Sequence, residues 1–135
     1  MSEEKALHFS SGKLGLDQLD VEFLCEMALV LNFGEYKYER DNWKQGSDYH
    51  EIFGSIFRHY AAFALGENLD TESGLSHLAH IAIDAMFLFY WEQNGVGFDD
   101  RPERNSIPKI IRERLEDTIA TAKELRQQRE EKTNE

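Results

Sequence analysis

The segment DTESGLSHLAHIAIDAMFLFYWEQ, residues 70–93, decides the fold class of this chain. Apolar residues recur in it every three or four positions, which is the spacing of one face of an α-helix. The pattern predicts a helix that begins between Asp70 and Ser73, ends near Gln93 and is the most buried element of the protein. The residues expected to face the core are Leu78, Ile81, Ala82, Ala85, Leu88 and Phe89.

Three other segments have the same periodicity. One helix is predicted from Asp17 to about Gly34, and a second begins near Asp48 and stops at Gly66. A fourth begins near Ser106 with Pro108 in its first turn. Since no convincing alternating strand pattern is present, the sequence predicts an all-α fold, a four-helix bundle that oligomerisation completes or extends.

The length of 135 residues suits one domain with a single hydrophobic core. We expect residues 1–135 to form that domain, with an N-terminal extension over 1–16 and a frayed tail over 127–135. The N-terminus lacks a signal-peptide pattern, and no run reaches about 18 apolar residues. The chain is therefore expected in the cytoplasm of a host cell, away from membranes, which its lone Cys25 also permits.

The formal net charge of −11 argues against a nucleic-acid-binding protein, because such a protein needs a basic surface to bind phosphates. An acidic protein can still bind a free nucleotide when metal ions supply the positive charge. The composition therefore argues against a nucleic-acid partner but leaves a free nucleotide as a possible ligand.

Titratable residues gather at the start of the segment quoted above. Glu67, three residues before the segment, and Asp70, its first residue, form a Glu-x-x-Asp unit, while His77, His80 and Asp84 fall on one helical face. Acids at a helix N-terminus are often caps, and a single histidine is more often a hydrogen-bonded residue than a ligand. Together, however, such groups are costly to desolvate unless they are paired or bind metal, and carboxylate oxygens suit Mg²⁺ or Mn²⁺.

Spacing disfavours several other metal sites. The chain has no His-Glu-x-x-His unit, and its one cysteine cannot build a thiolate zinc site. No glutamate has a histidine three residues later, as di-iron bundles require, and no histidine is followed by aspartate.

Residues before the quoted segment add cations and aromatic rings. Arg58 and His59 interrupt the apolar stripe of the second helix, and Arg58 either pairs with the nearby acids or clamps phosphate. Lys37 offers a second cation, while Asn42 and Trp43 offer an amide and a stacking surface for a base. Glu35 and Glu39 are either solvated charges or further metal ligands; Trp43 is equally compatible with a core position.

The segments KYERDNWKQG (residues 37–46) and RHYAAFALGENLDTESGLSHLAHIAID (residues 58–84) resemble the phage and bacterial dATP/dGTP diphosphohydrolases, relatives of the MazG-like all-α nucleoside triphosphate pyrophosphohydrolases. The resemblance covers roughly residues 17–95. The shared pattern is Lys37–Tyr38, Asn42–Trp43, Arg58–His59, Gly66–Glu67, Asp70, Glu72–Gly74, His77 and His80.

This resemblance implies hydrolysis of a purine deoxynucleoside triphosphate between its α and β phosphates, with two or three Mg²⁺ or Mn²⁺ ions, in a homodimer or homotetramer. In phages whose DNA carries 2-aminoadenine, the product dGMP would supply synthesis of that base. The implied residues are catalytic Glu67, Asp70 and Glu39; metal-binding Glu35, Glu39, Glu67, Asp70 and Asp84; phosphate-binding Lys37, Arg58, His77 and His80; and base-binding Asn42 and Trp43.

One departure concerns the metal ligands. The MazG pattern Glu-Glu-x-x-Glu followed by Glu-x-x-Asp is present only in its second part, as Glu67 and Asp70.

Two rival functions are a non-catalytic nucleotide-binding or regulatory module, and a structural helical protein whose acids only cap helices. The first would bind nucleotide without releasing pyrophosphate, and the second would not be stabilised by metal.

Overall fold

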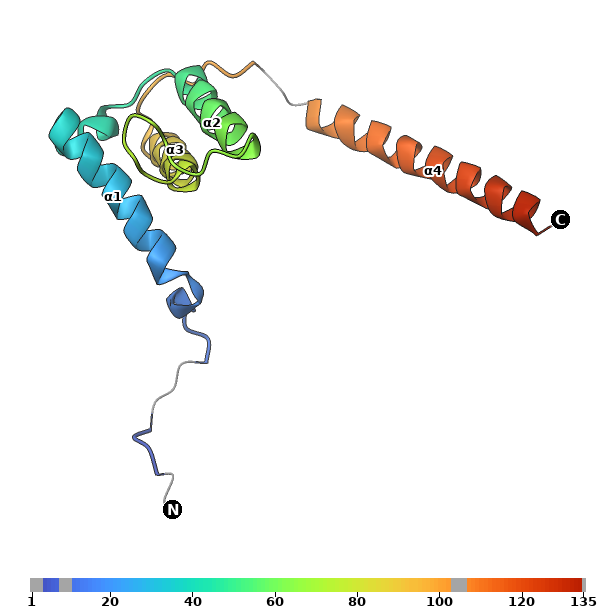
Figure 1. Cartoon of the computed structure of the whole chain (residues 1–135), viewed down its shortest axis with the longest axis horizontal. Helices are drawn as coiled ribbons and strands as arrows, with labels where there is room; N and C mark the ends of the chain where they lie inside the picture. Colours follow the sequence, from blue (N-terminus) through green and yellow to red (C-terminus); the bar gives the residue numbers. More distant parts are fainter. Residues whose placement is uncertain (1–3, 8–10, 103–106, 135) are drawn as a thin grey trace. The chain divides into compact units, whose positions relative to one another are not determined.

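The computed structural model describes residues 4–7, 11–102 and 107–134, which form helices and loops (Figure 1). No β-strand is present among them, so the predicted all-α class is confirmed. The elements are η1 (Leu16–Gln18), α1 (Val21–Lys37), η2 (Asn42–Gln45), α2 (Tyr49–Ala64), α3 (His77–Asn94) and α4 (Ile107–Thr133), where η marks a short 3-10 helix.

The chain divides into two compact units. Residues 1–98 contain α1, α2 and α3, and residues 99–135 contain α4. The placement of α4 in a four-helix bundle, the single domain over 1–135 and the oligomer therefore stay predictions. None of the described helices is both long and apolar enough to cross a membrane.

The first helix begins later than predicted and also ends later. Asp20, rather than Asp17, is the N-cap of α1, because its carboxylate accepts a hydrogen bond from the Phe23 N–H at 3.2 Å. Asp17 lies in the separate turn η1. The helix passes through Gly34, where it was expected to stop, and ends at Lys37.

The third helix begins at His77, several residues after the predicted start. Ser76 is its N-cap and accepts hydrogen bonds from the N–H groups of Leu78 and Ala79. Gly74 lies before it with φ of +71°, a left-handed conformation that interrupts any helix from Asp70. Residues 70–76 are therefore a loop, and the acids in them are not on the helix.

The fourth helix departs from the prediction at its C-terminal end. Its expected start near Ser106 lies outside the described residues, and α4 begins at Ile107. It continues to Thr133, through most of the segment for which we predicted fraying. Pairs one turn apart accompany this extension, such as Arg126 Nε donating to Glu130 Oε1 at 2.9 Å.

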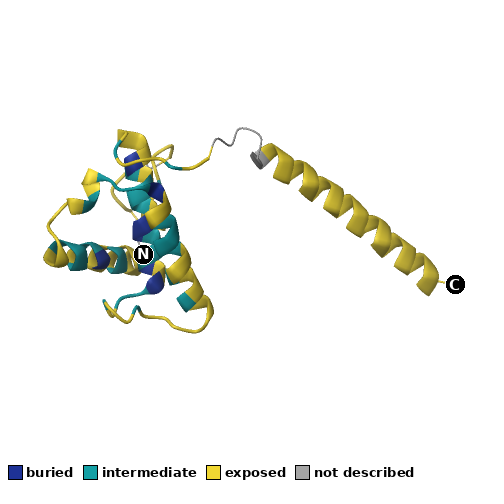
Figure 2. Ribbon diagram, turned by 90° about the horizontal axis from the view of Figure 1, so that it is seen from above, coloured by how far each residue is buried: buried dark blue, intermediate teal, exposed yellow. Residues whose placement is uncertain are grey.

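Helix α3 is the central element of the unit formed by residues 1–98. It packs against α1, α2 and η2 (Figure 1). The buried cluster is Val30 of α1 with Ala79 and Ile83 of α3, and partly buried apolar residues surround it: Met27, Leu31, Leu75, Met86 and Phe87. Figure 2 shows this buried zone along the helices of this unit, whereas the described residues of α4 are exposed.

The buried face of α3 is not the one we predicted. Of the six residues expected in the core, Leu78, Ala85 and Phe89 are exposed, and Ile81, Ala82 and Leu88 are only partly buried. The buried residues are His77, Ala79, Ile83, Asp84 and Trp91. The reason is that α1 and α2 cover the side of α3 that carries its polar groups.

Two contacts fix the segment between α1 and α2 against α3. The indole Nε1 of Trp91 donates a hydrogen bond to the backbone oxygen of Trp43 at 2.7 Å. Gly46, with φ of +83°, lies so close to Gly97 that a Cβ atom would be 2.3 Å from the Gly97 nitrogen. These contacts hold η2 close to α3, so that residues of both elements can line one cavity.

Candidate functional site

A cavity of about 910 Å³ lies in the unit formed by residues 1–98. This volume suits a small-molecule ligand. Residues of α1, η2, α2, α3 and the loop before α3 line it. Every predicted site residue is among them: Glu35, Lys37, Glu39, Asn42, Trp43, Arg58, Glu67, Asp70, His77, His80 and Asp84.

His77 is at the centre of the polar lining and is only 3% exposed. Its Nε2 lies 2.8 Å from Glu67 Oε1, and its Nδ1 lies 2.8 Å from Nδ1 of His59 on α2. Because the carboxylate can only accept, His77 donates through Nε2 and presents the lone pair of Nδ1 to His59. The pair of contacts therefore fixes both the orientation and the tautomer of His77.

His80 holds the other side of His59. The two imidazole rings stack with centroids 4.5 Å apart and an angle of 5° between their planes. His80 Nε2 also lies 2.8 Å from the hydroxyl oxygen of Ser73 in the preceding loop. Burial lowers the pKa of both His59 and His80, and the nearby Asp70 partly opposes this for both imidazoles. Both imidazoles are therefore neutral at pH 7.

Asp70 is held in place by the loop. Its Oδ2 accepts hydrogen bonds from the backbone N–H groups of Ser73 at 2.9 Å and Glu72 at 3.2 Å. Burial alone would raise the pKa of this carboxyl, but the hydrogen bonds from Ser73 and the nearby His80 and His59 outweigh it, so the pKa lies below its usual value. Asp70 is therefore ionised and oriented at neutral pH.

Asp84 is the buried acid of α3. It is 8% exposed, and its Oδ2 has no hydrogen-bond partner among the described residues. Burial raises its pKa to about 6, although a hydrogen bond with Ser55 and the charge of Arg58 act in the opposite direction. An unsatisfied carboxylate oxygen beside a ligand-sized cavity is costly unless a ligand, a cation or a proton compensates it.

The two predicted cations differ in their surroundings. Lys37 pairs with Glu72 across the cavity, and the hydrogen bonds with Glu72 and then Tyr38 raise its pKa. Arg58 has no carboxylate within 4.0 Å in the described part of the chain, although both it and Asp84 line the cavity. Arg58 is therefore the cation with the fewer internal contacts to give up when an anion binds.

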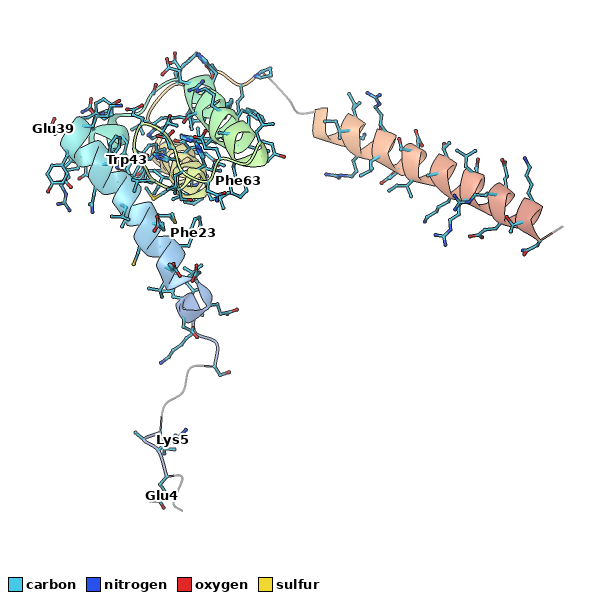
Figure 3. All side chains as sticks on the ribbon, viewed as in Figure 1. Glu4, Lys5, Phe23, Glu39, Trp43 and Phe63 are labelled. Atoms are coloured by element: carbon cyan, nitrogen blue, oxygen red, sulfur yellow. The ribbon has the colours of Figure 1, made fainter. Side chains whose placement is uncertain are left out.

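The carboxylates predicted to bind metal do not all converge. Glu35 lies 3.8 Å from Arg40 in a weak ion pair, and Glu39 is exposed just after α1 (Figure 3). Within the site as described, the groups whose ligand atoms lie within 4.8 Å of one another are His59, Asp70 and His77. This set of two imidazoles and one carboxylate suits a divalent ion, and the five-carboxylate set stays a prediction.

Trp43 is partly a structural residue. Its ring stacks on Phe87 with centroids 4.8 Å apart, and Tyr90 meets it edge-on at 4.9 Å. One face of the indole is therefore covered by α3, while Asn42 beside it is exposed. Their contact with a base stays a prediction.

His59 is a residue of the site that the sequence analysis placed in the shared pattern without giving it a role of its own. It follows Arg58 and shares a helical face with Ile52, Ile56 and Ala62, which are all partly buried. A histidine among apolar residues that face inward was a usable signal. What could not be read from the sequence was that this face of α2 meets the polar face of α3.

Comparisons with known proteins bear on the same part of the chain. A sequence model described as "dATP/dGTP diphosphohydrolase, N-terminal" matches residues 3–101. A dATP/dGTP diphosphohydrolase of Salmonella phage PMBT28 is 35% identical over 108 residues. That alignment covers 80% of this chain but only 37% of the relative's length. No solved structure matches the chain.

Proposed function

The chain belongs to the dATP/dGTP diphosphohydrolase family, and from this premise we propose that it hydrolyses a purine deoxynucleoside triphosphate between the α and β phosphates. Water adds to the α phosphorus, the bond to the bridging oxygen breaks, and the products are the nucleoside monophosphate and pyrophosphate. The observation that supports this most is that all the residues implied by the motifs line one cavity.

Charge complementarity supports a triphosphate as the ligand. Arg58 lines the cavity and forms no ion pair with a carboxylate of the described residues, and its guanidinium matches phosphate oxygens in a fork. Lys37 is a second cation that would exchange Glu72 for phosphate. Acidic side chains outnumber basic ones in the lining of the cavity, so divalent ions would be needed to offset the negative charge of the triphosphate there. We propose two or three Mg²⁺ or Mn²⁺ ions, held by carboxylates among Glu35, Glu39, Glu67, Asp70 and Asp84.

Such ions, when bound, supply positive charge for the pyrophosphate leaving group and make water a better nucleophile. The chain itself must orient that water and accept its proton. Glu39, Glu67 and Asp70 are the candidates. Glu67 is the best placed of them, because His77 fixes one of its oxygens while its side chain stays 44% exposed at the cavity.

For the base, we propose recognition by Asn42 and by the uncovered part of Trp43. We also propose dGTP as the main substrate, with dATP or GTP as further ones. The dGMP formed would then supply 2-aminoadenine synthesis in a phage, in the host-cell cytoplasm. The motif resemblance alone supports these finer points.

We propose a homodimer or homotetramer as the functional state. In the unit formed by residues 1–98, large apolar side chains remain exposed on α2 and α3, including Phe57 at 69%, Tyr60 at 60% and Phe89 at 65%. Exposed apolar surface of this kind marks a protein interface more often than a free surface. A second copy of the chain is the partner expected to complete or extend the predicted bundle.

The test is pyrophosphate release from each of the four deoxynucleoside triphosphates, with Mg²⁺, with Mn²⁺ and with a chelator. We expect metal-dependent release from purine substrates only, with the monophosphate as the second product. Nucleotide binding without pyrophosphate release, by a folded protein, would instead favour the non-catalytic module.

A further inference from the structure

Three donor groups from three elements meet at one point of the cavity. His59 comes from α2, Asp70 from the loop before α3, and His77 from the first residue of α3. One ligand atom of each lies within 4.8 Å of those of the other two. His77 is buried, while His59 and Asp70 are partly buried, so the donors are shielded from bulk water but open to the cavity.

The spacing of the two imidazoles fits a shared ion. Their Nδ1 atoms are 2.8 Å apart. Two nitrogen ligands at about 2.1 Å from a metal, at a right angle to each other, are about 3.0 Å apart. Before an ion binds, the same separation is a hydrogen bond from His59 to His77, so little movement is needed to form the site.

The surrounding contacts hold each donor in a ligand orientation. Glu67 accepts the Nε2 hydrogen of His77, which leaves the Nδ1 lone pair for an ion, as in the carboxylate–histidine–metal arrangement. Stacking on His80 fixes the ring plane of His59. Backbone N–H groups hold Asp70 through Oδ2.

We propose that His59, Asp70 and His77 form a binding site for one divalent first-row transition-metal ion, such as Mn²⁺, Co²⁺ or Zn²⁺, in preference to Mg²⁺. Imidazole nitrogen suits these ions, whereas Mg²⁺ favours oxygen ligands and retains its water. Glu67 is then a positioning residue for His77. Binding of this ion stands apart from the proposed hydrolysis; only its participation in the reaction would rest on that function.

The first experiment measures metal binding by the full chain without nucleotide, so that a failure of the proposed activity does not affect it. Calorimetric titrations with Co²⁺, Mn²⁺ and Mg²⁺ should give Co²⁺ and Mn²⁺ affinities at least tenfold higher than that of Mg²⁺. Equal affinity for Mg²⁺ would overturn the proposal.

The variant His59→Gln should weaken Co²⁺ and Mn²⁺ binding by at least tenfold, with Mg²⁺ binding unchanged. The matched control is Glu72→Gln, which removes a carboxylate from the loop that also holds Asp70. Glu72 pairs with Lys37 and does not belong to the three proposed metal donors. Its Co²⁺ affinity should stay within about twofold of the wild type. Unchanged Co²⁺ affinity in a folded His59→Gln protein would contradict the assignment.

A measurement on the wild type covers the case in which His59→Gln does not fold. Pulsed electron paramagnetic resonance of the Mn²⁺ protein should show couplings to two imidazole nitrogens. A spectrum with oxygen ligands only would exclude this site, whatever the variants do.

Discussion

The two faces of α3 differ in a way that reverses the usual pattern of a helix in a globular protein. The face covered by α1 and α2 carries His77, His80 and Asp84 beside a small apolar cluster. The opposite face carries Leu78, Ala85 and Phe89, which are exposed. Polar groups are normally outside and large apolar groups inside, because burying an unpaired polar group costs several kcal/mol in the extreme case.

The difference indicates that the covered face serves to line the cavity, whereas the exposed face is suited to contact another protein surface. The covered face has histidines and acids because they line the cavity, and hydrogen bonds with Glu67 and Ser73 reduce the cost of burying the imidazoles. The exposed face carries the apolar side chains that are typical of a protein core, but α1 and α2 do not cover them. We therefore expect substitutions on the covered face to affect ligand binding and chemistry, and substitutions on the exposed face to affect assembly.

The largest effect is expected from Asp70→Asn on the covered side. Asparagine keeps the shape and can still accept from the Ser73 N–H, but it loses the negative charge. Pyrophosphate release should fall by about 100-fold or more, with the melting temperature nearly unchanged. Steady-state rates with dGTP measure the first quantity and thermal unfolding the second. The control is Asp17→Asn in η1, an exposed acid away from the cavity, which should retain full activity.

Phe89→Ser tests the exposed face. Because this side chain is 65% exposed within its own chain, the monomer should lose little stability. If a second copy covers it, the dissociation constant of the oligomer should rise at least tenfold, since one buried aromatic ring contributes about 2 kcal/mol or more. Analytical ultracentrifugation over a concentration series measures this, with Phe89→Leu as the variant that keeps an apolar contact. Identical association of Phe89→Ser and wild type would place the interface elsewhere.

The variant Asp84→Asn tests how much the burial of this carboxylate destabilises the protein, through the pH dependence of the free energy of unfolding. The pKa of Asp84 is about 6 in the folded protein, above the 3.8 that is ordinary for an aspartate, so between these two pH values the folded state binds a proton that the unfolded state has lost. The contribution of Asp84 to stability therefore falls as pH rises through this window and stays reduced above pH 6. Asp84→Asn cannot ionise, and it should be more stable than wild type by on the order of 1 kcal/mol above pH 6 but not at pH 4.

Urea unfolding at pH 4, 5, 6 and 7.5 in the presence of a chelator gives these differences. A constant gain at every pH would mean that the charge of Asp84 is not responsible.

The smallest effect is expected from Ser76→Ala at the start of α3. The Ser76 hydroxyl accepts from the N–H groups of Leu78 and Ala79, so its loss should cost about 1 kcal/mol of unfolding free energy. Since His77 follows directly, the metal affinity should also fall slightly. Ser76→Asp, which can replace the cap, should restore stability; a Ser76→Ala protein as stable as wild type would show that the cap is dispensable.

The sequence predicted the helical class through periodicity, which is a local property, and its resemblance to the family implied the residues that line the cavity. It did not predict which side of α3 is covered. Leu78 and Phe89 fit an apolar stripe, and only the positions of α1 and α2 show that the stripe containing Ala79 and Ile83 faces inward. His59 was part of the shared pattern but received no role of its own, because that role depends on a neighbouring helix rather than on its own spacing.

The central claim is that the covered face of α3, together with His59, is the nucleotide site. The most direct test is to follow the imidazole signals by nuclear magnetic resonance while adding a dGTP analogue whose α–β bridge cannot be cleaved, with Mg²⁺ present. The account predicts that the signals of His59, His77 and His80 shift and that the signal of the exposed His50 on α2 does not. A nucleotide that binds without shifting any of the three cavity histidines would contradict it.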